Sequence, residues 1–305
     1  MILHESVTTA LAQAGLDPAD VERVVTAALD EDLRYGEDVT TMATVPAGMV
    51  ATAEVVARQP GVIAGGPVAL AVLDATGLPA GCATVLRPDG AAIAAGEAVL
   101  SIRAPLRGLL TAERTLLNLM TRLSGIATAT RAWVDAVDGT GAVVRDTRKT
   151  TPGLRLLEKY AVRCGGGANH RLGLGDAALI KDNHVAAAGG IGPAVAAVRE
   201  AIAARAAAGA GMLDAEVECD TLDQVKTALA AGCDLILLDN KGLADLRAAV
   251  ALARDWPGVL LEASGGLTLA AARDVALTGV DYLAVGGLTH SSPALDLGLD
   301  LRAGG

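Results

Sequence analysis

The chain has 305 residues, of which 25 are lysine or arginine and 35 are aspartate or glutamate, so its formal net charge is −10. Hydrophobic residues make up 52 %, aromatic residues only 2 %, and phenylalanine is absent. The apolar fraction excludes a disordered chain, and folding a chain of this length is expected to bury about 75 % of its unfolded surface. Nucleic-acid binding is disfavoured, because positive charge and stacking aromatics are both scarce.

The first hundred residues predict a mixed α/β region. Asp17 and Pro18 form a helix start, with Asp as the N-cap and Pro at the first helical position. Residues 50–57 alternate apolar side chains with small or polar ones, as a strand does, and residues 98–103 are a second candidate strand. A longer helix is expected from about Leu106, because leucines recur there on one helical face.

A different pattern begins at Gly141, where short apolar runs alternate with amphipathic helical runs. Near-continuous apolar strands between helices predict a parallel sheet that helices cover. Because no GxGxxG turn follows the first strand, a TIM-like barrel is favoured over a Rossmann sheet, and the strand count points to an incomplete barrel or to strands not recognised. The expected strands are residues 142–146, 177–181, 214–219, 234–239, 259–264 and 281–286, and the expected helices include residues 193–208, 221–231, 243–254 and 268–277.

Positive charge is concentrated in residues 145–181, which hold eight basic and three acidic residues and carry a net charge of +5. The other 268 residues therefore carry −15. Since the strands of a parallel barrel end on one face, the polar residues at their exits are expected to meet in one cleft. A cationic cluster at this cleft predicts an anionic ligand, because like charges otherwise destabilise the fold. The basic residues are Arg145, Arg148, Lys149, Arg155, Lys159, Arg163, Arg171 and Lys181.

Glycine turns and carboxylates at strand exits predict further parts of the site, and each has a structural alternative. The turns at residues 264–266 and 286–287 suit a phosphate, because glycine lets backbone N–H groups approach an anion, but ordinary strand–helix turns use the same residues. Glu218 and Asp239 suit Mg²⁺ or sugar hydroxyls, or else form structural ion pairs. His170 could bind an anion or act as an acid, whereas the other candidate histidines, His184 and His290, are as readily structural.

The sequence predicts a cytoplasmic protein. The N-terminus has early acidic residues and no basic segment before a long apolar run, so a signal peptide is not expected. No stretch reaches about 18 uncharged apolar residues, which argues against a membrane span. The absence of CxxC spacing argues against a zinc site and favours small, buried or half-buried thiols in a reducing compartment. The cysteines are Cys82, Cys164, Cys219 and Cys233.

The run RDTRKTTPGLRLLEKYAVRCGGGANHRLGLGDAALIKDNH, from Arg145 to His184, closely resembles the quinolinate phosphoribosyltransferases. Five further segments resemble the same family, in the same order along the chain. They are GEDVTT near Gly36, ERTLLNLMTRLSGIAT (Glu113–Thr128), LILLDN (Leu235–Asn240), EASGGL (Glu262–Leu267) and DYLAVGGLTHS (Asp281–Ser291).

The resemblance implies an enzyme of NAD biosynthesis that transfers phosphoribosyl from phosphoribosyl pyrophosphate to quinolinate, with Mg²⁺ required. The implied products are nicotinate mononucleotide, pyrophosphate and CO₂. The implied fold is an N-terminal mixed α/β domain of the open-sandwich type over residues 1–116, to which the tail 291–305 returns, and an incomplete TIM-like α/β barrel over residues 117–290. The implied assembly is a homodimer with a shared active site, or a hexamer.

The resemblance also implies a role for each matching residue. Two carboxylates of quinolinate are held by Arg148, Arg171 and Lys181, joined by Arg114 from the partner subunit. Lys149 and His170 face the pyrophosphate. Glu218 and Asp239 bind the ribose hydroxyls and Mg²⁺. Lys149, Glu218 and Asp239 are the implied catalytic residues. The 5′-phosphate is held by Ser264, Gly265, Gly266, Gly286, Gly287 and His290. Arg155, Lys159 and Arg163 are left without a role in binding.

Three other functions compete with this one. A related phosphoribosyltransferase could act on nicotinate or another small anion, but four cations for one carboxylate exceed what a monoacid needs. A binding barrel without catalysis would not need Lys149, Glu218 and Asp239. A nucleic-acid role for the basic segment is the weakest alternative, because the rest of the chain carries −15.

Overall fold

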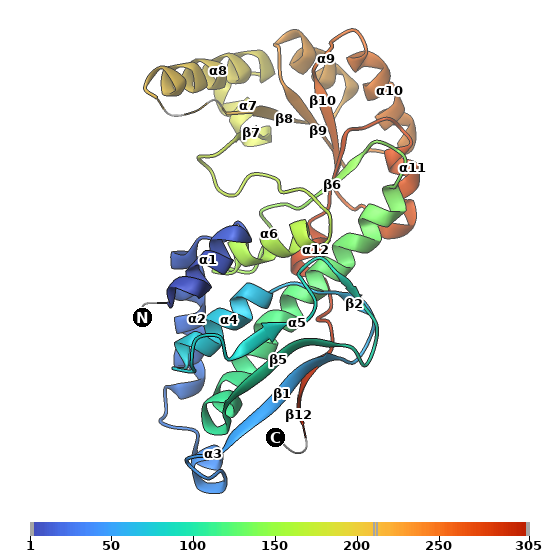
Figure 1. Ribbon diagram of the computed structural model, residues 1–305. Helices are drawn as coiled ribbons and strands as arrows, with labels where there is room; N and C mark the ends of the chain where they lie inside the picture. Colours follow the sequence, from blue (N-terminus) through green and yellow to red (C-terminus); the bar gives the residue numbers. More distant parts are fainter. Residues whose placement is uncertain (1–2, 210, 212, 303–305) are drawn as a thin grey trace. The chain divides into compact units, whose positions relative to one another are not determined.

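The computed structural model describes residues 3–209, 211 and 213–302 (Figure 1). The chain forms two compact units. The first comprises residues 1–131, 150–166 and 287–305, and the second comprises residues 132–149 and 167–286. This division differs from the expected boundary at 116, because the long helix α5 (Leu106–Val137) contributes its first 26 residues to the first unit and residues 150–166 return to that unit.

The first unit is built on an antiparallel sheet in which the C-terminal tail takes an edge position (Figure 1). The strand order in the described residues is β12-β1-β5-β3. The tail strand pairs with β1 from Ala53 opposite Leu301 to Ala57 opposite Leu297. The strands are β1 (Val50–Ala57), β3 (Ala83–Val85), β5 (Ala98–Pro105) and β12 (Leu297–Leu301), with β2 (Gly61–Val62) and β4 (Ala92–Ile93) as a separate pair. Residues 303–305 of the expected tail lie outside the described residues.

Helices complete the first unit, and the predicted helix start at residue 17 is confirmed. Asp17 accepts a hydrogen bond from the Ala19 N–H at 2.9 Å, and Pro18 occupies the first helical position. Asp89 accepts from the Gly65 and Gly66 N–H groups at the start of α4, so it acts as the cap of that helix. The helices are α1 (Glu5–Gln13), α2 (Pro18–Leu33), α3 (Val39–Thr44), α4 (Gly66–Ala75), α6 (Arg155–Cys164), α12 (Gly287–His290) and the first part of α5.

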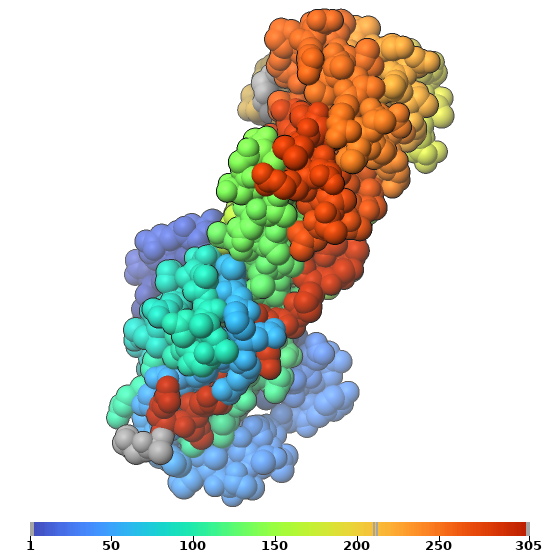
Figure 2. Space-filling view, turned by 90° about the vertical axis from the view of Figure 1, so that its right-hand side faces the viewer, coloured from blue at the N-terminus to red at the C-terminus, as the bar shows by residue number. Residues whose placement is uncertain are grey.

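The segment that carries α3 projects from the first unit, as the blue atoms at its lower end show in Figure 2. Arg107 of α5 fixes this segment by donating to the Val45 carbonyl at 2.8 Å. Several apolar side chains on it face solvent, among them Tyr35, which is 93 % exposed, and Val39, which is 79 % exposed. Exposed apolar groups clustered on a projection are typical of a surface that another protein chain covers.

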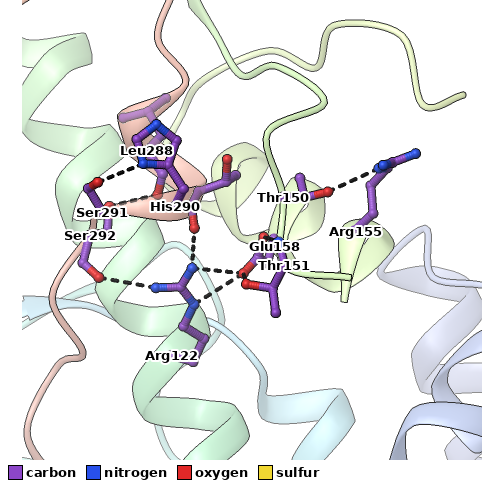
Figure 3. A network of polar contacts seen from close by, with 10 residues as sticks. Arg122, Thr150, Thr151, Arg155, Glu158, Leu288, His290, Ser291 and Ser292 are labelled. Atoms are coloured by element: carbon purple, nitrogen blue, oxygen red, sulfur yellow. Dashed lines mark hydrogen bonds and ion pairs between the residues drawn. The ribbon is translucent and has the colours of Figure 1, made fainter. Parts of the chain in front are cut away.

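A buried carboxylate ties three segments of the first unit together (Figure 3). Glu158 of α6 is fully buried and accepts two hydrogen bonds from the Arg122 guanidinium, the closer at 2.8 Å. It also accepts from the Thr151 N–H and hydroxyl at 2.9 Å and 2.8 Å. Arg122 in turn donates to the carbonyl groups of Thr289 and Ser292, at the end of α12. Arg122 and Glu158 thus join α5, α6 and the segment after α12.

The second unit contains all six strands that the sequence predicts after residue 141. In its described residues they form one parallel sheet in the order β6-β11-β10-β9-β8-β7 (Figure 1). The strands are β6 (Val143–Arg145), β7 (Ala178–Ile180), β8 (Ala215–Cys219), β9 (Leu235–Asp239), β10 (Leu260–Ser264) and β11 (Tyr282–Ala284). The helices between them are α7 (Asp182–Ala188), α8 (Ile191–Ala207), α9 (Leu222–Ala230), α10 (Leu243–Ala253) and α11 (Ala272–Ala276), with a 3₁₀ turn at Leu269–Ala271.

This sheet is an incomplete barrel, as expected. Consecutive strands from β7 to β11 are neighbours, and β11 pairs with β6, so the strand order is that of a barrel. Within the described residues no ladder joins β6 to β7. Instead, residues before β7 run beside β6, where Ala168 exchanges backbone hydrogen bonds with Val144 and Asp146. The opening in the barrel is therefore partly closed by loop backbone.

Each of the four cysteines, all of them among the described residues, is free. Cys219 and Cys233 are buried, and Cys82 and Cys164 are half-buried. Burial raises the pKa of the Cys219 thiol to about 12 and that of Cys164 to about 11, so these thiols stay protonated and poorly reactive at neutral pH.

No single helix in the described chain is both long and apolar enough to cross a membrane. The adjoining helices α7 and α8, which are bent by 93° from one another, meet the same length and composition criteria when taken as a pair.

The Glu158 network yields a stability prediction. Replacing Glu158 with Ala leaves the Arg122 guanidinium without its buried partner, and we expect the variant to lose about 3 kcal/mol of unfolding free energy. The measurement is the midpoint of urea unfolding. The matched control is Asp223→Asn, which removes a carboxylate paired with Lys226 on an exposed helical surface and should leave the midpoint unchanged. Equal midpoints for both variants would contradict a stabilising role for Glu158.

Candidate active site

A cavity of about 380 Å³ opens at the carboxyl ends of the strands in the second unit. Side chains two positions apart on one strand face the same side, so residues 216 and 218 of β8, 237 and 239 of β9, and 262 and 264 of β10 all point inward. Register places Leu237 beside both Glu218 and Glu262, and Asp239 beside Ser264. The cavity is lined by Thr147, Arg148, Lys149, His170, Arg171, Leu179, Lys181, Glu218, Leu237, Asp239, Glu262, Ser264 and Ala284.

Four cations from three segments line this cavity. Arg148 and Lys149 follow β6, Arg171 precedes β7, and Lys181 directly follows β7. Burial and the neighbouring Arg148 both lower the pKa of Arg171. The Arg148 Nε is buried and has no hydrogen-bond partner, which is costly for a charged donor. An anion in the cavity would supply this missing acceptor.

Carboxylates anchor the segments that carry the cations. Asp146, which is fully buried, accepts from the His170 N–H at 2.9 Å and from the Asn169 side chain at 2.6 Å. Lys181 is ion-paired with Glu218. Arg171 donates to the Ala177 carbonyl at 3.2 Å. These contacts fix the segments that carry the cations.

His170 lies at the base of the cavity, against two buried carboxylates. Its Nε2 is 2.9 Å from a Glu216 oxygen and 3.5 Å from a Glu262 oxygen. Glu262 also accepts from Arg145 at 2.9 Å, and Arg145 lies over the Tyr282 ring. One oxygen of Glu216 and one of Glu262 are buried without a hydrogen-bond partner.

Two opposing effects act on the proton of the His170 ring. Burial lowers the pKa of His170, but interactions with the Glu216 and Glu262 carboxylates outweigh it and raise the pKa to about 9. The Arg171 N–H acts in the opposite direction, because it donates to Nδ1 at 2.7 Å and can do so only while Nδ1 is unprotonated. Burial also raises the pKa of Glu262. A pKa of about 9 alone would leave the ring doubly protonated at neutral pH, but a proton on Nδ1 would oppose the Arg171 N–H at 2.7 Å. The observed contact therefore corresponds to the neutral ring, with its proton on Nε2.

The turn after β10 brings backbone into close contact with the end of β9. Gly265 has a φ of 82°, and a Cβ there would lie 2.4 Å from the Asn240 side-chain oxygen, so only glycine fits. Asn240 itself has a φ of 52°, a conformation that is uncommon outside glycine and recurs at functional sites. The Asn240 N–H donates to the Ser264 carbonyl at 2.8 Å. This turn leaves glycine backbone exposed beside Asp239, as an anion-binding turn requires.

The structure brings together eight of the residues that the resemblance implies. Gly265 and Gly266 directly follow Ser264, and Gly286 follows β11 in the same unit. Three others belong to the first unit: Arg114 is exposed on α5, and Gly287 and His290 form the ends of α12. The eight that line the cavity are Arg148, Lys149, His170, Arg171, Lys181, Glu218, Asp239 and Ser264.

Sequence reasoning gave no role to three buried acidic residues of the site. Asp146, Glu216 and Glu262 are each no more than 3 % exposed. A signal for Glu216 and Glu262 was present, because each lies between two apolar residues within a strand, and a buried carboxylate destabilises the fold unless it has a partner. The partners could not be found from sequence, because they come from other strands and loops.

The donor set at the end of β8 and β9 suits a hard cation. Glu218 and Asp239 supply carboxylate oxygens to the same cavity, and Mg²⁺ is usually held by one or two carboxylates together with substrate phosphates and water. Asp239 also accepts from the Asn240 side-chain amide at 2.7 Å, which fixes its orientation. These two residues could hold Mg²⁺ when a phosphorylated substrate completes its coordination.

Comparisons with known proteins agree with this geometry. A family model described as the N-terminal domain of quinolinate phosphoribosyl transferase matches residues 38–124, and the C-terminal domain of the same family matches residues 126–300. A nicotinate-nucleotide pyrophosphorylase [carboxylating] from Mycobacterium leprae is 58 % identical over 277 residues, covering 90 % of this chain and 94 % of the relative. The human protein of that name is 39 % identical, with 81 % of each chain covered.

Solved structures show the same likeness. The nicotinate-nucleotide pyrophosphorylase from Francisella tularensis superposes with a TM-score of 0.85 at 37 % identity, covering 93 % of this chain and 96 % of that one. The protein from Ehrlichia chaffeensis gives a TM-score of 0.83 at 35 % identity, with 92 % and 98 % covered. On the strength of both domains and of these relatives, the chain belongs to the quinolinate phosphoribosyl transferase family.

Proposed function

We propose that this chain transfers the phosphoribosyl group of phosphoribosyl pyrophosphate to quinolinate and releases pyrophosphate and CO₂, giving nicotinate mononucleotide for NAD biosynthesis. The observation that carries the proposal is the ring of cations around one cavity, with a buried Arg148 donor that lacks an acceptor. A planar guanidinium binds a carboxylate through two parallel hydrogen bonds. Arg148 and Arg171 supply two such groups, which suits the two carboxylates of quinolinate.

The residues of the cavity would act mainly by holding the reactants in a reactive orientation. Arg148, Arg171 and Lys181 hold the carboxylates, so that the ring nitrogen faces the anomeric carbon of the ribose. A bond forms between these two atoms as the bond to pyrophosphate breaks, and Lys149 stabilises the departing charge. The new positive ring nitrogen then stabilises the carbanion that remains when the 2-carboxylate leaves as CO₂, and this carbon takes up a proton from water to give nicotinate mononucleotide.

The turn after β10 would hold the 5′-phosphate. Ser264, Gly265 and Gly266 offer hydroxyl and backbone donors at the end of a strand, where parallel barrels commonly bind phosphate. Gly286, Gly287 and His290 are proposed to complete that site. Glu218 and Asp239 would orient the ribose hydroxyls and hold Mg²⁺, which when bound neutralises charge on the pyrophosphate.

We also propose a homodimer, alone or within a hexamer, in which the first unit of one subunit completes the site of the other. Arg114 is exposed on α5, so its guanidinium could extend into the active site of a second subunit. Tyr35 and Val39 on the projecting α3 segment offer apolar surface for such an interface. We also propose a cytoplasmic location, because the four cysteines are free and a reducing compartment keeps thiols in this state.

The direct test is turnover with two alternative acids. Purified protein with Mg²⁺ and phosphoribosyl pyrophosphate should form nicotinate mononucleotide and CO₂ from quinolinate, and adding EDTA should stop the reaction. Product from nicotinate but not from quinolinate would contradict the proposal and indicate the monoacid enzyme. Binding of quinolinate without turnover would indicate a barrel that only binds.

Arg148 provides a prediction about the acid site. Arg148→Ala removes a bidentate contact to a substrate carboxylate, and we expect kcat/KM for quinolinate to fall by at least about 100-fold. Arg148→Lys keeps the charge but not the planar fork and should recover only part of this loss. Arg247→Ala, which removes an exposed arginine from α10 of the same unit, is the control and should match the parent. Parental activity in Arg148→Ala would show that the acid binds elsewhere.

Mixing two inactive variants tests the shared site. Arg114→Ala and Lys149→Ala proteins should each be inactive alone. If the two residues serve one site from different subunits, unfolding and refolding them together gives heterodimers with one intact site, and about a quarter of the parental activity returns. If both residues act within one chain, no heterodimer has an intact site and no activity returns.

A further inference from the structure

His170 uses both of its ring nitrogens within the protein. Its Nδ1 lies 2.7 Å from the backbone nitrogen of Arg171, and its Nε2 lies 2.9 Å from a carboxylate oxygen of Glu216. The side chain is only 8 % exposed although it lines the cavity. A histidine bound in this way has no ring N–H left for the pyrophosphate of the donor.

The two contacts fix the tautomer together. A backbone amide can only donate, so Nδ1 must accept, and the ring proton must be on Nε2. From Nε2 the proton points at Glu216, which is 3 % exposed and offers a strong acceptor. The carboxylate of Glu216 therefore orients the ring, and the ring in turn presents a lone pair to the Arg171 amide.

The segment that receives this contact is fixed from both sides. The His170 N–H donates to Asp146 at 2.9 Å, and Asp176 accepts from the N–H groups of Leu172 and Gly173. Arg171 stands between these two anchors, and its own amide is held by the His170 ring. The His170 ring is thus the contact that holds the Arg171 backbone itself, while the Ala177 carbonyl accepts from the Arg171 guanidinium at 3.2 Å.

We infer that Glu216 and His170 are positioning residues that act through Arg171 on the quinolinate carboxylate, and that His170 does not bind the pyrophosphate. The inference rests on the proposed function, because it names the substrate that Arg171 receives. Glu262 adds a second carboxylate 3.5 Å from Nε2 and is itself held by Arg145.

The same three side chains are spaced closely enough to hold a metal ion. A metal bound at Nε2 needs an unprotonated Nε2, and the ring would then carry its proton on Nδ1. That proton would face the Arg171 N–H, and two donors would oppose one another at 2.7 Å. The backbone contact therefore favours the hydrogen-bonded arrangement over metal coordination.

Two substitutions of His170 distinguish a residue that positions Arg171 from one that binds the pyrophosphate, because they affect the KM values of the two substrates differently. Asn places an oxygen near the position of Nδ1 and can still accept from the Arg171 amide, whereas Gln places its amide near Nε2 and cannot. We expect His170→Gln to raise the KM for quinolinate about tenfold and His170→Asn to raise it less than about threefold. The KM for phosphoribosyl pyrophosphate should stay within about twofold in both. The reverse order, or a rise confined to phosphoribosyl pyrophosphate, would overturn the inference.

A double variant tests whether the effect passes through Arg171. If it does, adding His170→Ala to Arg171→Ala should raise the KM for quinolinate no further than about twofold. If the two residues acted independently, the increases in KM of the two single variants would multiply. His4→Ala is the matched control, because His4 Nδ1 also accepts from a backbone N–H, that of Ser6, at the start of α1 outside the cavity. It should match the parent. A parent protein that fails to turn over quinolinate would instead contradict the proposed function.

The tautomer itself can be observed in solution. In ligand-free protein labelled with ¹⁵N-histidine, the ring signals that disappear in His170→Asn should show a protonated Nε2 and an unprotonated Nδ1. Glu216→Leu, which removes the acceptor, should change this pattern and raise the KM for quinolinate as His170→Gln does. A doubly protonated ring, or a Glu216→Leu variant with parental KM, would overturn the inference.

Discussion

The site depends on keeping several positive charges close together around one cavity. Four cations line one cavity, and at these separations like charges repel strongly unless opposite charge lies nearby. The compensating carboxylates lie behind or beside the cations, and they accept hydrogen bonds from the segments that bear them. Glu218 pairs with Lys181, while Asp146 and Asp176 bind the backbone on either side of Arg171. The positive charge that suits an anionic substrate is thus balanced by carboxylates of the protein itself.

The parallel strands make this arrangement possible. Alternate residues of β8 and β10 point into the barrel, so the strands can place Glu216 and Glu262 toward the base of the cavity and Glu218 and Ser264 at its edge. A carboxylate buried alone would be costly, and here each finds a basic partner on another element. These buried ion pairs at the base of the cavity therefore orient the residues that line it. Apolar packing would fix the directions of those side chains less well, because it is not directional.

The sequence predicted the strands of the second unit closely, because each is a short apolar run between amphipathic helices. It also predicted that Lys149 and Asp239, far apart in the chain, would line one cavity, since the strand ends of a parallel barrel share a face. It could not show that the segment with charge +5 divides between two units. Arg163 donates to the Gly15 carbonyl and Lys159 is buried in α6, so part of that charge serves the first unit. Patterns along the chain carry no information about such long-range partners.

Orientation of the bound acid decides what the cations can do for the reaction. A carboxylate held by a flexible cation could rotate, and the ring nitrogen would then spend little time facing the ribose. The Arg171 guanidinium is held at its far end by the Ala177 carbonyl, and the Arg171 backbone is held by the His170 ring, so both ends of the side chain are restrained. Charges that are already in position also stabilise the transition state without the reorganisation energy that moving charges would require. The buried Glu216 and His170 would then contribute to catalysis without contacting either substrate, by determining where Arg171 points.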